Sequence, residues 1–88
     1  MCVAPEDRVE IRPDACLPVE LLHLQFRVER GEPARVIAAW CEALARAYAA
    51  RLAVDPSSST DREVLGLLTS EGKRFRRIAA EEGLSKVS

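Results

Sequence analysis

The fold of this 88-residue chain is decided by residues 33–53, which read PARVIAAWCEALARAYAARLA. Apolar and aromatic side chains recur there every three or four residues, as on one side of a helix: they are Ile37, Trp40, Cys41, Leu44, Tyr48 and Leu52. Arg35, Glu42 and Arg46 lie on the opposite side, and the alanines between them are strong helix formers. The stretch therefore predicts a long amphipathic helix, which ends before the turn-forming run DPSSS at residues 55–59.

A second long helix is predicted after this turn. Residues 60–63, TDRE, have the pattern of a capping box, in which the Thr60 hydroxyl accepts from the backbone N–H of Glu63 and the Glu63 carboxylate reaches back. The predicted helix covers about residues 60–82, and Gly83 is placed to be its C-cap. Its apolar residues are Val64, Leu65, Leu68, Phe75, Ile78 and Ala79.

Two glycines, Gly66 and Gly72, lie inside this second helix. Each weakens it by up to about 1 kcal/mol relative to alanine, unless the missing side chain lets a neighbouring helix come close. Two long helices joined by a short polar loop are typical of an antiparallel helical hairpin. The predicted fold class is therefore mainly α: a short N-terminal extended segment, followed by two or three helices that form an antiparallel hairpin or bundle.

Residues 18–30 carry two periodicities. Pro18 suits the first turn of a helix and Gly31 suits its end, and the apolar residues at 17, 21, 24 and 28 would then form one stripe. The apolar residues at 22, 24, 26 and 28 also alternate with polar ones, as they do in a strand. The signals at the two ends favour a helix, which is apolar on two sides and would have to be buried on both; the strand stays open as the alternative.

Residues 1–16 are predicted to form an N-terminal arm in front of a helical domain of residues 17–88. Residues 8–12 alternate polar and apolar side chains, which indicates a short extended segment, and residues 13–16 have the composition of a turn. A single domain of this size is near the limit of independent stability, and oligomerisation is a common remedy. We therefore expect a homodimer.

The formal net charge of −1 at pH 7 argues against attraction of the whole surface to nucleic acid. Residues 1–32 carry seven acidic and four basic side chains, whereas residues 71–88 carry three acidic and five basic ones. An acidic front and a basic end can pair between subunits or attract a partner, although such charges most often form ordinary solvated surface.

The cysteines and the single histidine form no catalytic or metal-binding pattern. Cys2, Cys16 and Cys41 are odd in number and widely spaced, and His23 has no identifiable nucleophile or orienting carboxylate. The sequence contains no phosphate-binding loop and no dinucleotide-binding motif. We expect a non-enzymatic protein without metal or cofactor. The sequence shows no signal peptide, no transmembrane run and no paired cysteines, and this favours the cytoplasm.

The aromatic side chains of residues 33–53 indicate a candidate protein interface. Aromatic anchors often dominate protein–protein binding, and the same side chains would serve equally as the core of a monomer or dimer. The predicted partner-binding candidates share the apolar stripe: they are Ile37, Trp40, Leu44 and Tyr48.

Basic side chains gather near the end of the chain. The predicted phosphate contacts are Lys73, Arg74, Arg76 and Arg77, with glutamates nearby that weaken their field. Residues 75–88 also read like the first helix and turn of a helix-turn-helix, with Ser85 placed to cap a recognition helix. Only three residues follow Ser85, which is too few for a helix that lies along a major groove.

Short motifs lie at both ends of the chain: VEIRP at residues 9–13, Leu17-Pro18 at the start of a helix, and KVS at residues 86–88. In this order they resemble the TraM family of quorum-sensing antiactivators. The resemblance implies long antiparallel helices, a dimeric helical assembly, and binding to a LuxR-type transcription factor that is thereby kept off DNA. More loosely, a strand at residues 8–12 with helices on either side of Gly31 resembles a ribbon-helix-helix repressor.

The sequence therefore predicts a small regulatory protein that binds another protein, most concretely a transcription factor that it holds inactive. The alternative is a DNA-binding regulator that uses a helix-turn-helix-like or ribbon-helix-helix-like element.

Overall fold

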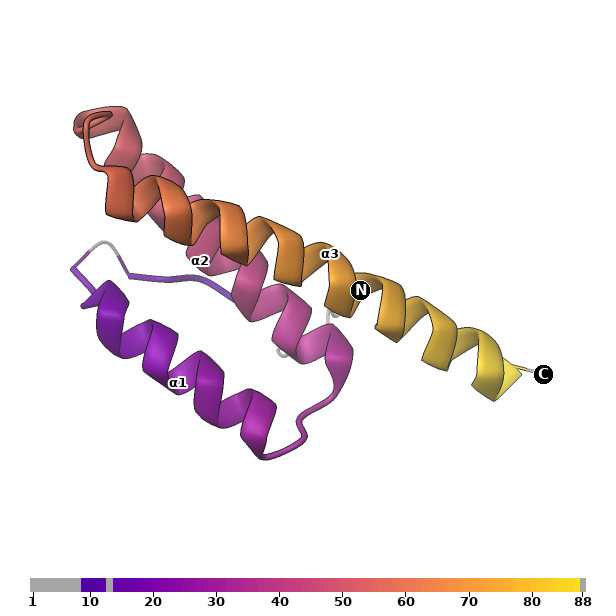
Figure 1. Ribbon diagram of the computed structural model, residues 1–88. Helices are drawn as coiled ribbons and strands as arrows, with labels where there is room; N and C mark the ends of the chain where they lie inside the picture. Colours follow the sequence, from indigo (N-terminus) through magenta and orange to yellow (C-terminus); the bar gives the residue numbers. More distant parts are fainter. Residues whose placement is uncertain (1–8, 13, 88) are drawn as a thin grey trace, which may run out of the picture.

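The computed structural model describes residues 9–12 and 14–87, with side chains described as far as Gly83. Three helices account for most of these residues: α1 (Leu17–Glu29), α2 (Ala34–Val54) and α3 (Ser59–Val87) (Figure 1). No strand occurs in the described ranges, so the prediction of a mainly helical fold is confirmed. None of these helices combines the length and the apolar character that crossing a bilayer requires.

The central helix is α2, which packs against α3 as an antiparallel hairpin and also against α1 (Figure 1). The buried cluster at the centre of the core consists of Leu17, Leu44, Tyr48 and Leu68, which come from all three helices. Helices α2 and α3 are in contact at Gly72, where an added Cβ would lie 3.5 Å from the Cβ of Cys41, an ordinary contact distance. The predicted close approach of a helix that depends on glycine is therefore found at neither position, because a Cβ on Gly72 would make an ordinary contact and a Cβ on Gly66 would meet nothing within 4 Å.

The start of α3 differs from the predicted capping box. The hydroxyl of Ser58, not that of Thr60, accepts a hydrogen bond from a backbone N–H, that of Asp61 at 3.3 Å. The carbonyl of Ser58 also accepts from the N–H of Arg62 at 3.2 Å, so the first helical turn is already closed there. Two Ser/Thr-x-x-acid patterns overlap in this segment, and the short turn after α2 selects the earlier one.

The end of α3 also differs from the prediction. Gly83 does not act as a C-cap, because α3 runs through it to Val87. A C-cap glycine adopts positive φ, and among the described glycines only Gly31 does so. No proline follows Gly83 to stop the helix. The last turns of α3 extend beyond the start of α2 (Figure 1).

The two periodicities of residues 18–30 are settled in favour of the helix α1. Pro18 lies in its first turn. At its end Gly31 has φ +73°, and its N–H donates to the carbonyl of Val28 at 3.0 Å. The N–H of Glu32 donates to the carbonyl of Arg27 at 3.2 Å. Both bonds together form a Schellman motif, which satisfies carbonyls of the last turn and favours glycine at the left-handed position.

The N-terminal segment lies along the helices without forming a strand in residues 9–12. The carbonyl of Val9 accepts a hydrogen bond from Arg46 of α2 at 3.3 Å, and Ile11 packs against the core cluster. The predicted turn is confirmed where it is described, because the N–H of Ala15 donates to the carbonyl of Arg12 at 3.0 Å. The expected extended segment begins at Arg8, which lies outside the described residues.

Candidate protein-binding surface

Three of the four predicted contact residues lie in the core. Ile37, Leu44 and Tyr48 are at most 3% exposed. Burial also raises the pKa of the Tyr48 hydroxyl above its usual value of 10.0. A partner could reach these side chains only if the helices separated, because they are packed against the chain's own helices. Of the four predicted contact residues on α2, only Trp40 therefore remains accessible to a partner.

Trp40 is half-buried, and a side chain of the same molecule lies over its ring. The guanidinium carbon of Arg27 is 4.1 Å from the ring centroid, which is a cation–π contact. Arg27 is held there by Glu32, to which its Nη1 donates at 3.2 Å. Any partner that binds this face of Trp40 must first displace Arg27, so Trp40 is better placed to anchor α1 against α2 than to anchor a partner.

The side of α1 that faces away from α2 carries large apolar side chains that remain in contact with solvent. Val19 is 44% exposed, and Leu22 and Phe26 are each 50% exposed. Their spacing of three and four residues places them on one side of α1, opposite to Leu21 and Leu24, which pack against the core. We call Val19, Leu22 and Phe26 the outer face of α1.

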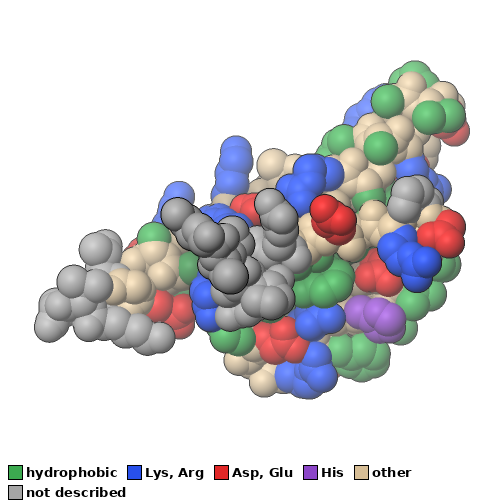
Figure 2. Space-filling model, turned by 180° about the vertical axis from the view of Figure 1, so that it is seen from behind, with side chains coloured by type: hydrophobic (Ala, Val, Ile, Leu, Met, Phe, Trp, Pro, Cys, Tyr) green, Lys and Arg blue, Asp and Glu red, His purple; other side chains and the backbone are tan. Residues whose placement is uncertain are grey.

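Polar side chains border the outer face of α1. A shallow depression lies at the C-terminal end of α1, and it is lined by His23, Phe26, Arg27, Glu29 and Arg30. In Figure 2 green apolar side chains lie next to the purple one, which is the chain's only histidine, His23. Apolar residues surrounded by a charged rim are the usual composition of a protein interface. The sequence carried a signal for this surface in the second apolar side of residues 18–30.

The predicted phosphate contacts lie on α3 and are partly neutralised. Arg76 donates from Nε and Nη2 to both carboxylate oxygens of Glu42 in α2, at 2.9 and 2.7 Å. This hydrogen bond is the main reason that the pKa of Glu42 lies below its usual value. Arg74 pairs with Glu71 at 3.2 Å. Lys73 and Arg77 are exposed, so the cluster offers a weaker positive field than its sequence indicates.

The turn of the predicted helix-turn-helix is absent from α3. Residues 75–87 continue one helix, and neither Gly83 nor Ser85 breaks it. The prediction of a turn at this position is therefore wrong, because Gly83 keeps a helical backbone. The residues that would bend toward a groove instead prolong α3.

The titratable groups of the described residues form no metal site, since no group of three His, Cys, Asp or Glu side chains there is suitably placed. Cys41 is buried between α2 and α3, and burial raises its pKa to about 11. Cys16 is exposed. His23 lies 4.0 Å from Glu20 on the same helix.

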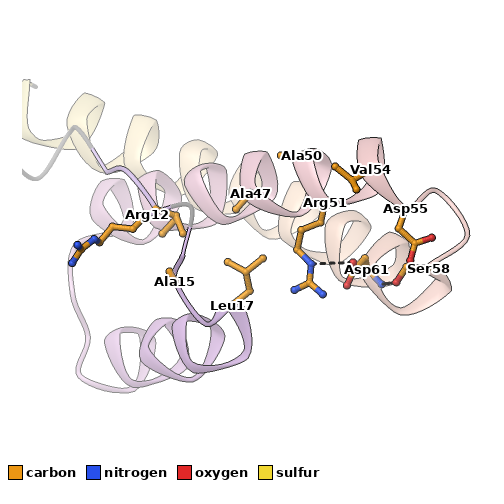
Figure 3. A pocket seen from close by; sticks show the side chains of 11 residues that line it. Arg12, Ala15, Leu17, Ala47, Ala50, Arg51, Val54, Asp55, Ser58 and Asp61 are labelled. Carbon is orange, nitrogen blue, oxygen red and sulfur yellow. Dashed lines mark hydrogen bonds and ion pairs between the residues drawn. The ribbon is translucent and has the colours of Figure 1, made fainter.

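A cavity of about 740 Å³ opens between the N-terminal segment, the second half of α2 and the start of α3 (Figure 3). Arg51 of α2 projects into it, and its Nε lies 3.3 Å from Oδ2 of Asp61, which belongs to α3 and is buried. We call this the Arg51 cavity. Its walls come from segments far apart in the sequence, and sequence patterns did not reveal it.

Comparison of the chain with protein-family models, with curated proteins and with solved structures finds no match, so the resemblance to the TraM family stays a prediction.

Proposed function

We propose that this chain is a small regulatory protein that binds another protein through the outer face of α1 and catalyses no reaction. The observation that supports this proposal is the exposure of Val19, Leu22 and Phe26 on a helix whose opposite side already packs against the core. A helix that is apolar on two sides is stable when a second layer covers the free side.

Covering the outer face of α1 would stabilise a complex appreciably. Full burial of a valine, leucine or phenylalanine side chain contributes about 1.5–3 kcal/mol. Because these three side chains are 44–50% exposed, their burial would contribute roughly 3 kcal/mol in all. Association costs more than this in lost freedom of motion, so the partner must also contact the rim at His23 and Arg30. The rim then sets specificity through its charges.

The partner that we propose is a transcription factor, as the resemblance to antiactivators implies. Binding through the outer face of α1 would hold that factor in an inactive complex in the cytoplasm. In the absence of the factor, the same face would pair with a second copy of the chain, which gives a homodimer. No enzymatic step and no cofactor is part of this proposal.

The test uses a partner recovered from the native host by affinity capture, identified by mass spectrometry and then purified. Titration of this partner should give an affinity that falls about ten-fold or more in the double variant Leu22→Gln, Phe26→Gln. Leu67→Gln is the matched control, since Leu67 is 66% exposed on α3, away from α1. Equal loss in both variants, or no loss in either, would contradict the proposed surface.

Direct DNA binding is the competing outcome. A sequence-specific footprint at physiological salt that is lost on replacement of Lys73 and Arg77 by alanine would reject the protein-binding proposal. We expect only weak, nonspecific DNA binding that moderate salt abolishes, because Arg74 and Arg76 are already paired with glutamates.

A further inference from the structure

We propose that the Arg51 cavity binds a small aliphatic carboxylate, whose head group pairs with Arg51 and whose chain lies on the apolar wall of the cavity. This inference is independent of the proposed function, because the cavity lies on the inner side of α1 at Leu17. Its volume of about 740 Å³ is within the range of small-molecule sites in proteins.

The guanidinium of Arg51 is positioned to receive an anion. Its side chain is 51% exposed, and Figure 3 shows it directed from α2 into the space between Leu17 and Asp61. The ion pair with Asp61 uses Nε and fixes the orientation of the guanidinium. The guanidinium carbon also lies 5.7 Å from the centroid of the Tyr48 ring, and among the described residues no acceptor bonds to the two terminal nitrogens. A carboxylate can accept two parallel hydrogen bonds from such an edge.

The other charged side chains that line the cavity are Arg12, Asp55 and Asp61, and Arg12 pairs with Asp14 at 3.8 Å. Asp61 already pairs with Arg51, and Asp55 accepts hydrogen bonds from both the N–H and the hydroxyl of Ser57. Both acidic side chains are therefore engaged within the chain. The N-terminus of α1 also opens here, and its N-cap Cys16 makes no side-chain hydrogen bond. Uncapped N–H groups at the start of a helix attract negative charge.

Most of the remaining wall of the cavity is apolar, although Ser58 also lines it. Alkyl side chains from the N-terminal segment, α1 and α2 face it: they are Ile11, Leu17, Ala47, Ala50 and Val54. Val54 is 87% exposed, so a bound alkyl chain would remove apolar surface from water on the protein side as well. A ligand with one anionic end and an unbranched apolar body matches both parts of the cavity.

The experiment is a titration of the isotope-labelled full chain with octanoate, followed by the backbone amide signals. Octanamide is the neutral control of the same shape, and octylammonium is the cationic one. Octanoate should bind about ten-fold or more tightly than octanamide, since charge-assisted hydrogen bonds are the stronger kind. The shifted signals should map to residues 11–17 and 47–54. Equal binding of octanoate and octanamide, no binding of octanoate, or shifts confined to the outer face of α1 would overturn the proposal.

Two pairs of variants separate binding from folding. Arg51→Gln should weaken octanoate about ten-fold and leave octanamide unchanged, with Arg77→Gln as the control at an exposed arginine of α3. Because Arg51→Gln also leaves the buried Asp61 without its partner, Ala50→Phe provides a second probe that fills the cavity and should abolish binding. Ala49→Phe is its control, as Ala49 is exposed on α2 outside the cavity. Octanoate binding that survives in folded Ala50→Phe would refute the site.

Discussion

Alanine in place of the two glycines inside α3 should stabilise the protein. A Cβ at Gly66 would meet nothing within 4 Å, and a Cβ at Gly72 would lie 3.5 Å from the Cβ of Cys41 and 3.7 Å from Cγ of Glu42, which are ordinary contact distances. Glycine within a helix costs about 1 kcal/mol relative to alanine. Each substitution should therefore raise the free energy of unfolding by about 1 kcal/mol, which corresponds to a rise in Tm of about 4–8 °C for a domain of this size.

The opposite sign is expected at Gly31. This residue has φ +73°, and an alanine there would be strained although no atom lies within 4 Å of its Cβ. Gly31→Ala should lower the free energy of unfolding by about 1 kcal/mol.

Because we place the contact between copies on α1, Gly66→Ala should stabilise the protein equally at low and high protein concentration.

Urea unfolding followed by circular dichroism measures all three variants on the same scale. A loss of stability in Gly72→Ala would mean that α2 and α3 lie closer together than the structure places them. A loss in Gly66→Ala that grows with protein concentration would mean that α3, not α1, meets a partner. A neutral Gly31→Ala would contradict the Schellman motif that ends α1.

Trp40→Ala should lower the free energy of unfolding by about 2 kcal/mol, because Trp40 is half-buried and replacing a fully buried tryptophan costs about 3–5 kcal/mol. Thermal unfolding together with titration of the purified partner shows whether binding changes as well. A variant unchanged in both measurements would mean that this side of α2 is wrongly assigned. The stabilisation from the Glu42–Arg76 pair should be present above the usual Glu42 pKa of 4.5 and should be lost as pH falls through the lower pKa of Glu42 in the folded protein. Glu42→Gln should remove this part of the acid dependence of urea unfolding. An identical pH profile in the variant and the wild type would contradict this role of the pair. Burial and a pKa of about 11 should protect Cys41 from iodoacetamide at pH 8, while the exposed Cys16 reacts. Peptide mapping after labelling measures the modification of each cysteine. Rapid labelling of Cys41 in the folded protein would refute its position in the core.

The hairpin of α2 and α3 could be predicted from sequence because its signals agree at every level. The apolar repeat of residues 33–53 has one period, Pro33 precedes it, and the turn residues 55–58 follow it. The ends of α3 could not be predicted so well. Ser58 and Thr60 both start a capping pattern, and only the geometry of the turn decides between them. Gly83 is compatible with both a helix and a C-cap, and nothing in its neighbours excludes the helix.

The candidate surfaces differ in the same way. The stripe from Ile37 to Tyr48 predicted apolar contact correctly but could not distinguish the core of one chain from an interface between chains. The outer face of α1 corresponds to the second apolar side of residues 18–30 in the sequence. This second side produced the alternating pattern that is also typical of a strand, and the single chain leaves it exposed to solvent. The Arg51 cavity forms because the fold brings Ile11, Arg51 and Asp61 close together. Local sequence patterns do not predict contacts between residues that are so far apart in the chain.

Sedimentation velocity at micromolar concentration tests the proposed role of the outer face of α1 most directly. The wild-type chain and Leu67→Gln should sediment as a dimer, with twice the 9.7 kDa mass of one chain. The double variant Leu22→Gln, Phe26→Gln should sediment as the 9.7 kDa monomer with unchanged helical content. A wild-type chain that stays monomeric, or a dimer that survives in the double variant, would contradict an interface on α1.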